Sequence, residues 1–195
     1  MVDTNLTILV IDEHPLRSAI LEDGLREAGY TNVVRIDTTH ELLRRVFSID
    51  PDVILIDLAN PSRDVLEQMF QVSRTVKRPV AVFVDQSDTA MIEAAVDAGV
   101  SAYIVDGLRK ERIRPVLDMT ISRFNAFDRL TKELEQARSE LAERKVIERA
   151  KGILMKSRGI SEEEAFALLR RTAMNEKKKL AEIAQSVVTA AQLLG

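Results

Sequence analysis

The sequence contains no cysteine and no tryptophan, and only 4% of its 195 residues are aromatic. Without cysteine the chain cannot form disulfides, thiolate metal sites or a cysteine nucleophile. No apolar run approaches the roughly 18 residues that a membrane-spanning helix needs. The short apolar run near the N-terminus follows no basic region, so a secretory signal is not expected. We therefore expect a cytoplasmic protein that makes no contact with a membrane.

The charge of the chain is unevenly distributed. Residues 1–122 contain 13 Lys and Arg against 20 Asp and Glu, a difference of −7, whereas residues 123–195 contain 15 against 11, a difference of +4. A basic C-terminal part is typical of a segment that meets nucleic acid or another acidic surface. A highly charged, solvent-exposed helix would give the same balance, so charge alone leaves both interpretations open.

Short apolar runs alternate with helical patterns along residues 1–122. The runs are Thr7–Ile11, Val33–Ile36, Val53–Ile56, Val80–Val84 and Ala102–Val105, and the helical patterns are Arg17–Ala28, Thr39–Phe47, Val65–Val76, Thr89–Ala98 and Lys110–Ile121. Buried runs separated by helices predict a parallel sheet covered on both faces. Because crossovers between parallel strands are right-handed, we expect an α/β fold with a doubly wound, flavodoxin-like five-stranded sheet.

The last of these helical patterns continues far beyond the expected sheet. No proline or glycine interrupts the chain between Pro115 and Gly152. Apolar residues recur at steps of three and four, close to heptad spacing: Ile113, Leu117, Ile121, Phe124, Phe127, Leu130, Leu134, Ala137 and Leu141. A long helix with one apolar seam needs a partner, which predicts a homodimer through a coiled coil. Packing of the seam against the first domain is the alternative.

The segment from Ile147 to Phe166 joins two further helical patterns. Gly159 supplies a residue that tolerates the left-handed conformation found at helix ends. Ser161 followed by Glu164 is a capping box, which predicts that a new helix begins there. The pattern of Lys178–Leu194 predicts another helix, so the C-terminal part is expected to form a small three-helix domain whose first helix is shared with the linker.

Several motifs in this region carry a family resemblance. The runs are ERAKGILM at residues 148–155, SEEEAF at 161–166, LLRR at 168–171, and Ala173-Met174. They resemble the ANTAR domain, a small RNA-binding module of bacterial transcription antiterminators. The part before them resembles a degenerate receiver domain of response regulators, and the whole chain is similar to nitrate/nitrite-responsive antiterminators. We expect a receiver-like domain at residues 1–122, a coiled-coil linker helix at 123–146 and an ANTAR domain at 147–195.

The resemblance to receivers assigns roles to three acidic residues. Asp12, Glu13 and Asp57 match the cluster that binds Mg²⁺ in receivers, and Asp57 matches the phosphoacceptor. Val84 stands where receivers carry a hydroxyl, and Asp106 where they carry a lysine. Losing one donor that stabilises the transition state costs about 3–4 kcal/mol of barrier. Phosphorylation is therefore expected to be impaired or absent. The chain is not expected to be an enzyme or to require a cofactor, although the acidic cluster leaves Mg²⁺ binding open.

The resemblance to ANTAR domains indicates the residues that contact RNA. It supports Lys151 and Arg170 most directly, while charge and spacing add Arg144, Lys156, Arg158, Arg171, Lys177 and Lys179. Small residues such as Ala150 and Gly152 are interpreted as packing positions where helices approach closely. The resemblance also implies a leader mRNA with paired hairpins carrying hexanucleotide loops, and a nitrate/nitrite-sensing regulatory protein as partner.

Two other classes of function remain as alternatives. Residues 161–174 and 178–194 could form a helix-turn-helix, which would indicate a phosphorylation-activated, DNA-binding response regulator. The last helix is largely apolar, however, and a recognition helix needs an exposed polar face to enter the major groove. The third class is an adaptor that contacts only proteins.

Overall fold

The computed structural model describes residues 5–38, 41–105 and 109–194. The chain divides into two compact units, Met1–Asp128 and Arg129–Gly195. The division falls inside one helix, α5 (Ile113–Arg158), which is 46 residues long. The helix continues through residues 122–123 and 146–147, so the expected domain borders at these positions coincide with no helix end. None of the described helices is long and apolar enough to cross a membrane.

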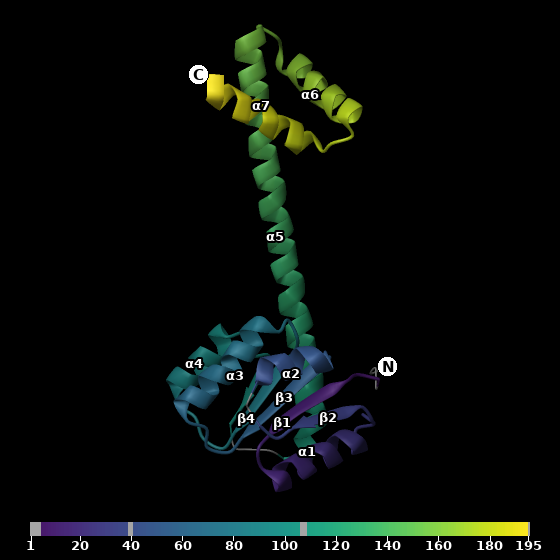
Figure 1. The fold of residues 1–195 in the computed structure, drawn as a ribbon, viewed down its shortest axis with the longest axis vertical. Coiled ribbons are helices and arrows are strands. Elements are labelled where there is room, and N and C mark those ends of the chain that lie inside the picture. Colours follow the sequence, from purple (N-terminus) through teal and green to yellow (C-terminus); the bar gives the residue numbers. More distant parts are fainter. Residues whose placement is uncertain (1–4, 39–40, 106–108, 195) are drawn as a thin grey trace. The chain divides into compact units, whose positions relative to one another are not determined.

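The first unit contains a five-stranded, all-parallel sheet with the order β2-β1-β3-β4-β5 (Figure 1). The strands are β1 (Ile8–Asp12), β2 (Val33–Ile36), β3 (Val53–Leu58), β4 (Val80–Val84) and β5 (Ala102–Ile104). Every residue of β1, β3 and β4 is buried, as expected for parallel strands covered on both faces. The strand order is that of flavodoxin-like folds, which confirms the predicted fold class.

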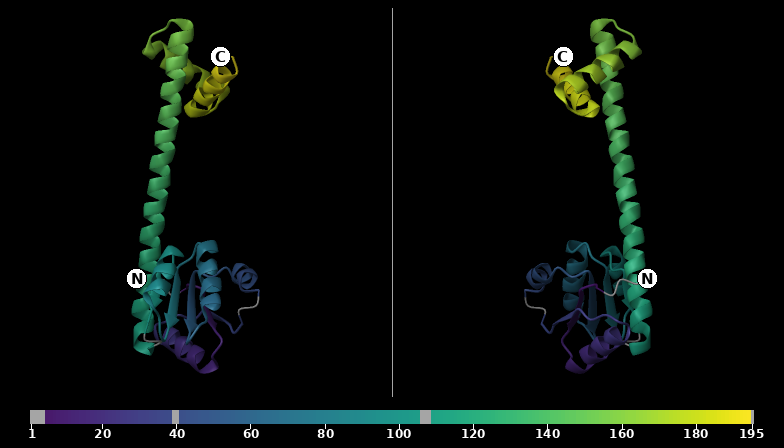
Figure 2. Two further views of the ribbon diagram at one scale, coloured as in Figure 1. Left: turned by 90° about the vertical axis from the view of Figure 1, so that its left-hand side faces the viewer. Right: turned by 90° about the vertical axis from the view of Figure 1, so that its right-hand side faces the viewer.

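Helices cover both faces of this sheet (Figure 2). They are α1 (Pro15–Glu27), α2 (Leu42–Ile49), α3 (Arg63–Thr75), α4 (Thr89–Asp97) and a short 3₁₀ turn, η1 (Lys110–Arg112), which leads into α5. One face packs against α1 and the start of α5, and the opposite face against α2, α3 and α4. Two residues of the second predicted helical pattern, Thr39 and His40, lie outside the described residues.

The strand register brings two carboxylates together at the carboxyl edge of the sheet. Asp12, the last residue of β1, pairs in register with Asp57 of the neighbouring β3. The adjacent strand β4 ends at Val84, and the backbone N–H of Asp85 donates to the Ala59 carbonyl at 3.0 Å. Functional groups of doubly wound sheets gather at this edge because the strands all end there.

The second unit contains three helices, as predicted: the last part of α5, α6 (Glu162–Glu176) and α7 (Leu180–Leu194). Their buried core consists of Ala150 and Leu154 from α5, Ala165, Leu169 and Ala173 from α6, and Ile183, Ala184 and Val188 from α7. Four of these residues are alanines, whose small side chains let the helices approach closely. Within each helix, core residues recur at intervals of four positions, as expected for one face of an α-helix.

Both local signals at the α5–α6 junction are confirmed. The helix α5 ends at Arg158, and Gly159 follows with a φ of 66°. Ser161 accepts a hydrogen bond from the Glu164 backbone N–H, and the Glu164 carboxylate accepts one from the Ser161 N–H at 2.8 Å. The Ser161 backbone N–H also holds the pKa of Glu164 below its usual value. These bonds satisfy donors that a helix start leaves unpaired.

Gly152 is not the packing position that its sequence context predicted. It is exposed on α5, and a Cβ atom added to it would meet no atom within 4 Å. A glycine inside a helix costs about 1 kcal/mol relative to alanine. Neither the core of the second unit nor any turn in its backbone explains why a glycine stands there.

Candidate acidic pocket and basic helical surface

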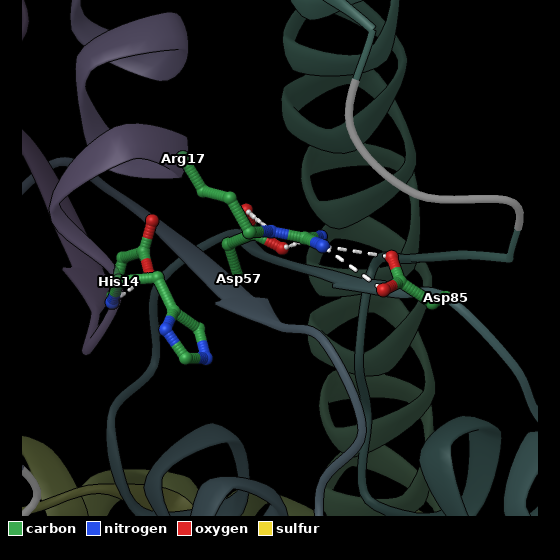
Figure 3. Close-up of polar contacts among 5 residues, drawn as sticks. His14, Arg17, Asp57 and Asp85 are labelled. Carbon is green, nitrogen blue, oxygen red and sulfur yellow. Dashed lines mark hydrogen bonds and ion pairs between the residues drawn. The ribbon is translucent and has the colours of Figure 1, made fainter.

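The acidic cluster at the edge of the sheet contains a cation from the chain itself (Figure 3). Arg17, in the first turn of α1, donates from Nε to Asp57 Oδ2 at 2.9 Å and from Nη2 to Asp57 Oδ1 at 2.6 Å. Its Nη1 donates to both carboxylate oxygens of Asp85, at 2.8 and 3.0 Å. One guanidinium therefore joins α1, β3 and the end of β4. We call this arrangement the Arg17 bridge.

The surroundings change the pKa values of Arg17 and of the neighbouring Asp12. The hydrogen bond to Asp57 raises the pKa of the Arg17 guanidinium. Burial raises the pKa of Asp12, and the neighbouring Asp57 carboxylate acts in the same direction. The His14 backbone N–H, 2.7 Å from Asp12 Oδ1, opposes this shift. The second oxygen of Asp12, Oδ2, is buried and accepts no hydrogen bond from the described part of the chain.

These residues do not fit the magnesium site that the sequence left open at Asp12, Glu13 and Asp57. Mg²⁺ requires near-octahedral oxygen ligands at about 2.0–2.1 Å. Both oxygens of Asp57 already accept hydrogen bonds from Arg17, and Glu13 is exposed. Over the described residues, no three His, Asp or Glu side chains are grouped as metal ligands. Both carboxylate oxygens of Asp57 are thus already paired with a cation, the guanidinium of Arg17.

The same contacts also affect the ability of Asp57 to accept a phosphoryl group. The Asp57 side chain is fully buried, and a carboxylate with both oxygens engaged by a guanidinium is a poor nucleophile. Val84 is buried at the end of β4, as expected, and brings no hydroxyl to the pocket. Asp106, which stands at the position of the receiver lysine, lies outside the described residues. The geometry does not support phosphoryl transfer to Asp57.

Arg17 was not among the residues predicted from the sequence, although a signal for it was available. Pro15 is favoured at the first position of a helix, so a helix could be expected to begin immediately after Asp12-Glu13-His14. Arg17 then falls in the first turn, beside the carboxyl ends of the strands. Its partner Asp85 also follows directly after a predicted strand.

The basic candidates of the second unit differ in their access to solvent. Lys151, which the resemblance supported most directly, is buried, with only 9% of its side chain exposed. Its ammonium lies 2.8 Å from a carboxylate oxygen of Glu148 and donates to Glu162 Oε1 at 2.6 Å. These hydrogen bonds raise the pKa of Lys151, and Lys151 lowers the pKa of Glu162.

The expectation that Lys151 is displayed on an exposed surface is therefore corrected. Glu162 belongs to the first turn of α6, so the ammonium of Lys151 links α5 to α6. The positive charge of this ammonium is balanced by two neighbouring carboxylates, and its side chain is covered, so it would attract a phosphate only weakly. Lys151 positions the start of α6 rather than forming part of an exposed surface.

The other basic candidates are exposed. They are Arg144, Lys156 and Arg158 on α5, Arg170 and Arg171 on α6, and Lys177 and Lys179 in the turn before α7. Among the residues that the structure describes, Arg170 and Arg171 have no acidic partner. Lys178, which was not among the candidates, pairs with Glu176 at 2.8 Å. Arg170 and Arg171 in the second half of α6, and Lys177 and Lys179 in the turn after it, are thus exposed cations close together in the sequence.

The sheet order, the edge carboxylates and the appended helical unit define a receiver domain joined to a second regulatory module. The response regulator receiver domain family matches residues 8–118, and the ANTAR domain family matches residues 135–188. The chain belongs to the response regulators that combine a receiver domain with an ANTAR domain. This combination is that of an antiterminator-type response regulator, and both domains are regulatory rather than catalytic.

Known relatives agree with this assignment. The transcriptional regulatory protein PdtaR of Mycobacterium tuberculosis is 28% identical over 181 residues, which cover 93% of this chain and 88% of PdtaR. The nitrate regulatory protein of Klebsiella oxytoca is 33% identical over 76 residues, 39% of this chain and 19% of that protein. The signal receiver domain of a modulated diguanylate cyclase from Desulfovibrio desulfuricans shares the fold, with a TM-score of 0.54, 18% identity and coverage of 63% of this chain and 98% of that domain.

Proposed function

We propose that this protein is a transcription antiterminator that binds hairpins in a leader transcript and prevents termination. The observation that carries the proposal is the pair of exposed arginines on α6, within the segment that matches the ANTAR domain. Arg170 and Arg171 are exposed and unpaired over the described residues, and a guanidinium can bind phosphate through two parallel hydrogen bonds. Arg144, Lys156, Arg158, Lys177 and Lys179 extend this charge.

The proposed RNA target also accounts for an exposed apolar stripe on α5. Leu130, Leu134 and Leu141 each expose more than half of their surface, and their spacing is that of a coiled-coil seam. A parallel pair of α5 helices would bury them and give a dimer with two ANTAR domains. Two hairpins on one transcript would then bind with a gain from effective concentration.

We further propose that the receiver domain receives its input from a protein rather than from phosphate. The Arg17 bridge engages both oxygens of Asp57, so the pocket is poorly suited to a phosphoryl group. A nitrate- or nitrite-sensing partner is the finer form of this proposal, and the similarity to a nitrate regulatory protein supports it. The similarity to PdtaR extends over far more of the chain, and other stimuli are compatible with it.

A DNA-binding response regulator is the main alternative. It would use α7 as a recognition helix, which needs an exposed polar face. The residues of α7 include Ile183, Ala184 and Val188 in the core, and its sequence has one acidic and no basic residue. A helix without a single cation is poorly suited to enter the groove of a polyanion, so we favour RNA.

Replacing Arg170 or Arg171 with alanine should weaken binding to a two-hairpin leader RNA by about tenfold each, because a charge-assisted hydrogen bond contributes roughly 1.5 kcal/mol. The slope of log K against log salt should fall by about one unit for each phosphate that the variant no longer binds. Fluorescence anisotropy at several salt concentrations measures both quantities, with duplex DNA as the competing ligand. Unchanged affinity in both variants, or tighter binding to the DNA, would contradict the proposal.

Lys151→Ala should behave differently. Because Lys151 links α5 to α6 through Glu148 and Glu162, its loss should lower the melting temperature of the helical unit. The salt dependence of RNA binding should stay that of the unmodified protein, since Lys151 binds no phosphate. A reduced salt slope at an unchanged melting temperature would show that Lys151 contacts RNA after all.

A further inference from the structure

A row of cations runs along the outer surface of α5 in the second unit. Lys145, Arg149 and Lys156 are exposed, and they flank Gly152 at intervals of four, three and four residues. Residues at these intervals lie on one face of a helix. The core residues Ala150 and Leu154 belong to a different face, the one that packs against α6 and α7. We call the four residues Lys145, Arg149, Gly152 and Lys156 the Gly152 row.

Contacts within the described chain do not account for this row. None of its three cations has an ion-pair partner among the residues that the structure describes. Glu148, which precedes Arg149 and lies three positions after Lys145, is bound to Lys151 at 2.8 Å. Like charges four residues apart, such as Lys145 and Arg149, repel each other and destabilise a helix. An interior glycine adds to that cost, and no atom of the protein approaches it.

A glycine on an exposed helix face removes the side chain that would keep a ligand at a distance. At Gly152 a bound molecule could therefore contact the backbone of α5 directly. Cations stand one turn before and one turn after this point, at Arg149 and Lys156. A smooth helix surface between two positive charges matches a ligand with a continuous run of negative charges.

A second copy of the chain is a less suitable occupant. The apolar seam of α5 contains Leu134 and Leu141, and its next positions in the heptad are Arg144 and Glu148. The seam that would bury a second α5 helix therefore ends before Gly152 is reached. Three cations facing three cations across a dimer interface would also repel each other.

We propose that the Gly152 row binds the sugar–phosphate backbone of RNA, as a contact surface separate from Arg170 and Arg171. This proposal rests on the RNA-binding function proposed above. The phosphates pair with Lys145, Arg149 and Lys156, while the ribose passes over Gly152 against the helix backbone. The row holds the stem of a hairpin, because its charges and its close approach recognise the nucleic-acid backbone and not the bases.

The decisive variant is Gly152→Leu in the full-length protein. A leucine has open space at this position and a better helix propensity than glycine, so folding is retained and the melting temperature rises. RNA affinity should nevertheless fall by roughly tenfold or more, because the side chain keeps the ribose away from the helix. Gly152→Ala should give an intermediate loss. The probe is a pool of two-hairpin RNAs with randomised hexanucleotide loops, measured by fluorescence anisotropy.

Matched controls separate this surface from general effects. Ser139→Leu adds the same side chain to an exposed position of α5 outside the row, and it should leave RNA affinity unchanged. Lys145→Gln, Arg149→Gln and Lys156→Gln should each reduce the salt slope by about one unit. Lys77→Gln removes an equal charge from the receiver domain and should not change the slope.

The outcomes also separate this proposal from the RNA-binding function itself. If Gly152→Leu binds the pool like the unmodified protein while Arg170→Ala binds weakly, the row is not an RNA contact although the protein binds RNA. If the unmodified protein does not bind the pool even at low salt, both proposals are wrong. If Gly152→Leu changes the oligomeric state in sedimentation experiments, the occupant of the row is a second copy, and the proposal is overturned.

Discussion

Leu134→Glu is expected to convert the proposed dimer into monomers and to weaken binding to a two-hairpin RNA by about 100-fold. Leu134 exposes 51% of its surface in the protomer, and glutamate has nearly the same helix propensity as leucine. The substitution therefore costs the folded protomer little. In a coiled coil, by contrast, it would place two carboxylates in the apolar seam, where burying an unpaired charge is strongly unfavourable. Sedimentation and RNA titration measure the two effects.

Two comparisons make this prediction specific. Affinity for an RNA with a single hairpin should be almost the same for the variant and the unmodified protein, because one ANTAR domain suffices for it. Ser139→Glu introduces the same charge at an exposed position of α5 outside the seam, and it should leave the dimer intact. If Leu134→Glu remained a dimer, the exposed stripe of α5 would not be the interface.

Asp57→Asn is expected to lower the free energy of unfolding of the receiver domain by about 2–3 kcal/mol. Breaking a fully buried ion pair by removing one partner costs about 3–5 kcal/mol. Here Asp57 is fully buried, but Arg17 is 22% exposed and keeps its contact with Asp85, which reduces the loss. Urea unfolding measures the change. The result would differ from that in a typical phosphoacceptor site, where removing one of several clustered carboxylates relieves repulsion.

The control for this prediction is Glu67→Gln on α3. Glu67 also pairs with an arginine, Arg74, at 2.6 Å, but both side chains are largely exposed. Exposed pairs contribute at most about 1 kcal/mol, so this variant should be almost as stable as the unmodified protein. Equal stability of Asp57→Asn and Glu67→Gln would show that the Arg17 bridge does not stabilise the fold. RNA affinity should be similar in both variants under conditions in which the receiver domain is folded, because neither residue belongs to the proposed RNA-binding surfaces.

Features that depend on neighbours in the chain could be predicted well. The apolar run at Val80–Val84 forms a fully buried strand with those bounds, because a buried parallel strand needs a continuous run of apolar residues. The run at Val33–Ile36 also forms a strand with its predicted bounds, at the edge of the sheet. The end of α5 just before Gly159 and the start of α6 just after its N-cap Ser161 were also predicted correctly. A left-handed glycine and a capping box act within one turn, so the local sequence contains all the information they need.

The candidate site was predicted less well, since its residues are brought together from distant parts of the chain. Arg17 and Asp85 are 68 positions apart and meet only because α1 begins and β4 ends at the same edge of the sheet. The sequence identified the acidic residues of the pocket but not the cation that pairs with them. Lys151 looked like an exposed RNA contact because its burial depends on Glu162, which α6 brings back against α5.

By itself the sequence determined the family, the order of strands and helices, and the basic character of the C-terminal part. The family followed from the resemblance of its motifs, the order of the elements from periodicity and capping, and the basic character from composition, all of which are properties of the local sequence. Only the tertiary structure decided which charges are free. Folding paired Asp57 with Arg17, and Lys151 with Glu148 and Glu162. Arg149, Arg170 and the helix face at Gly152 remained accessible. The physical reason is that the charge a side chain can offer to a ligand depends on the partners that folding places beside it.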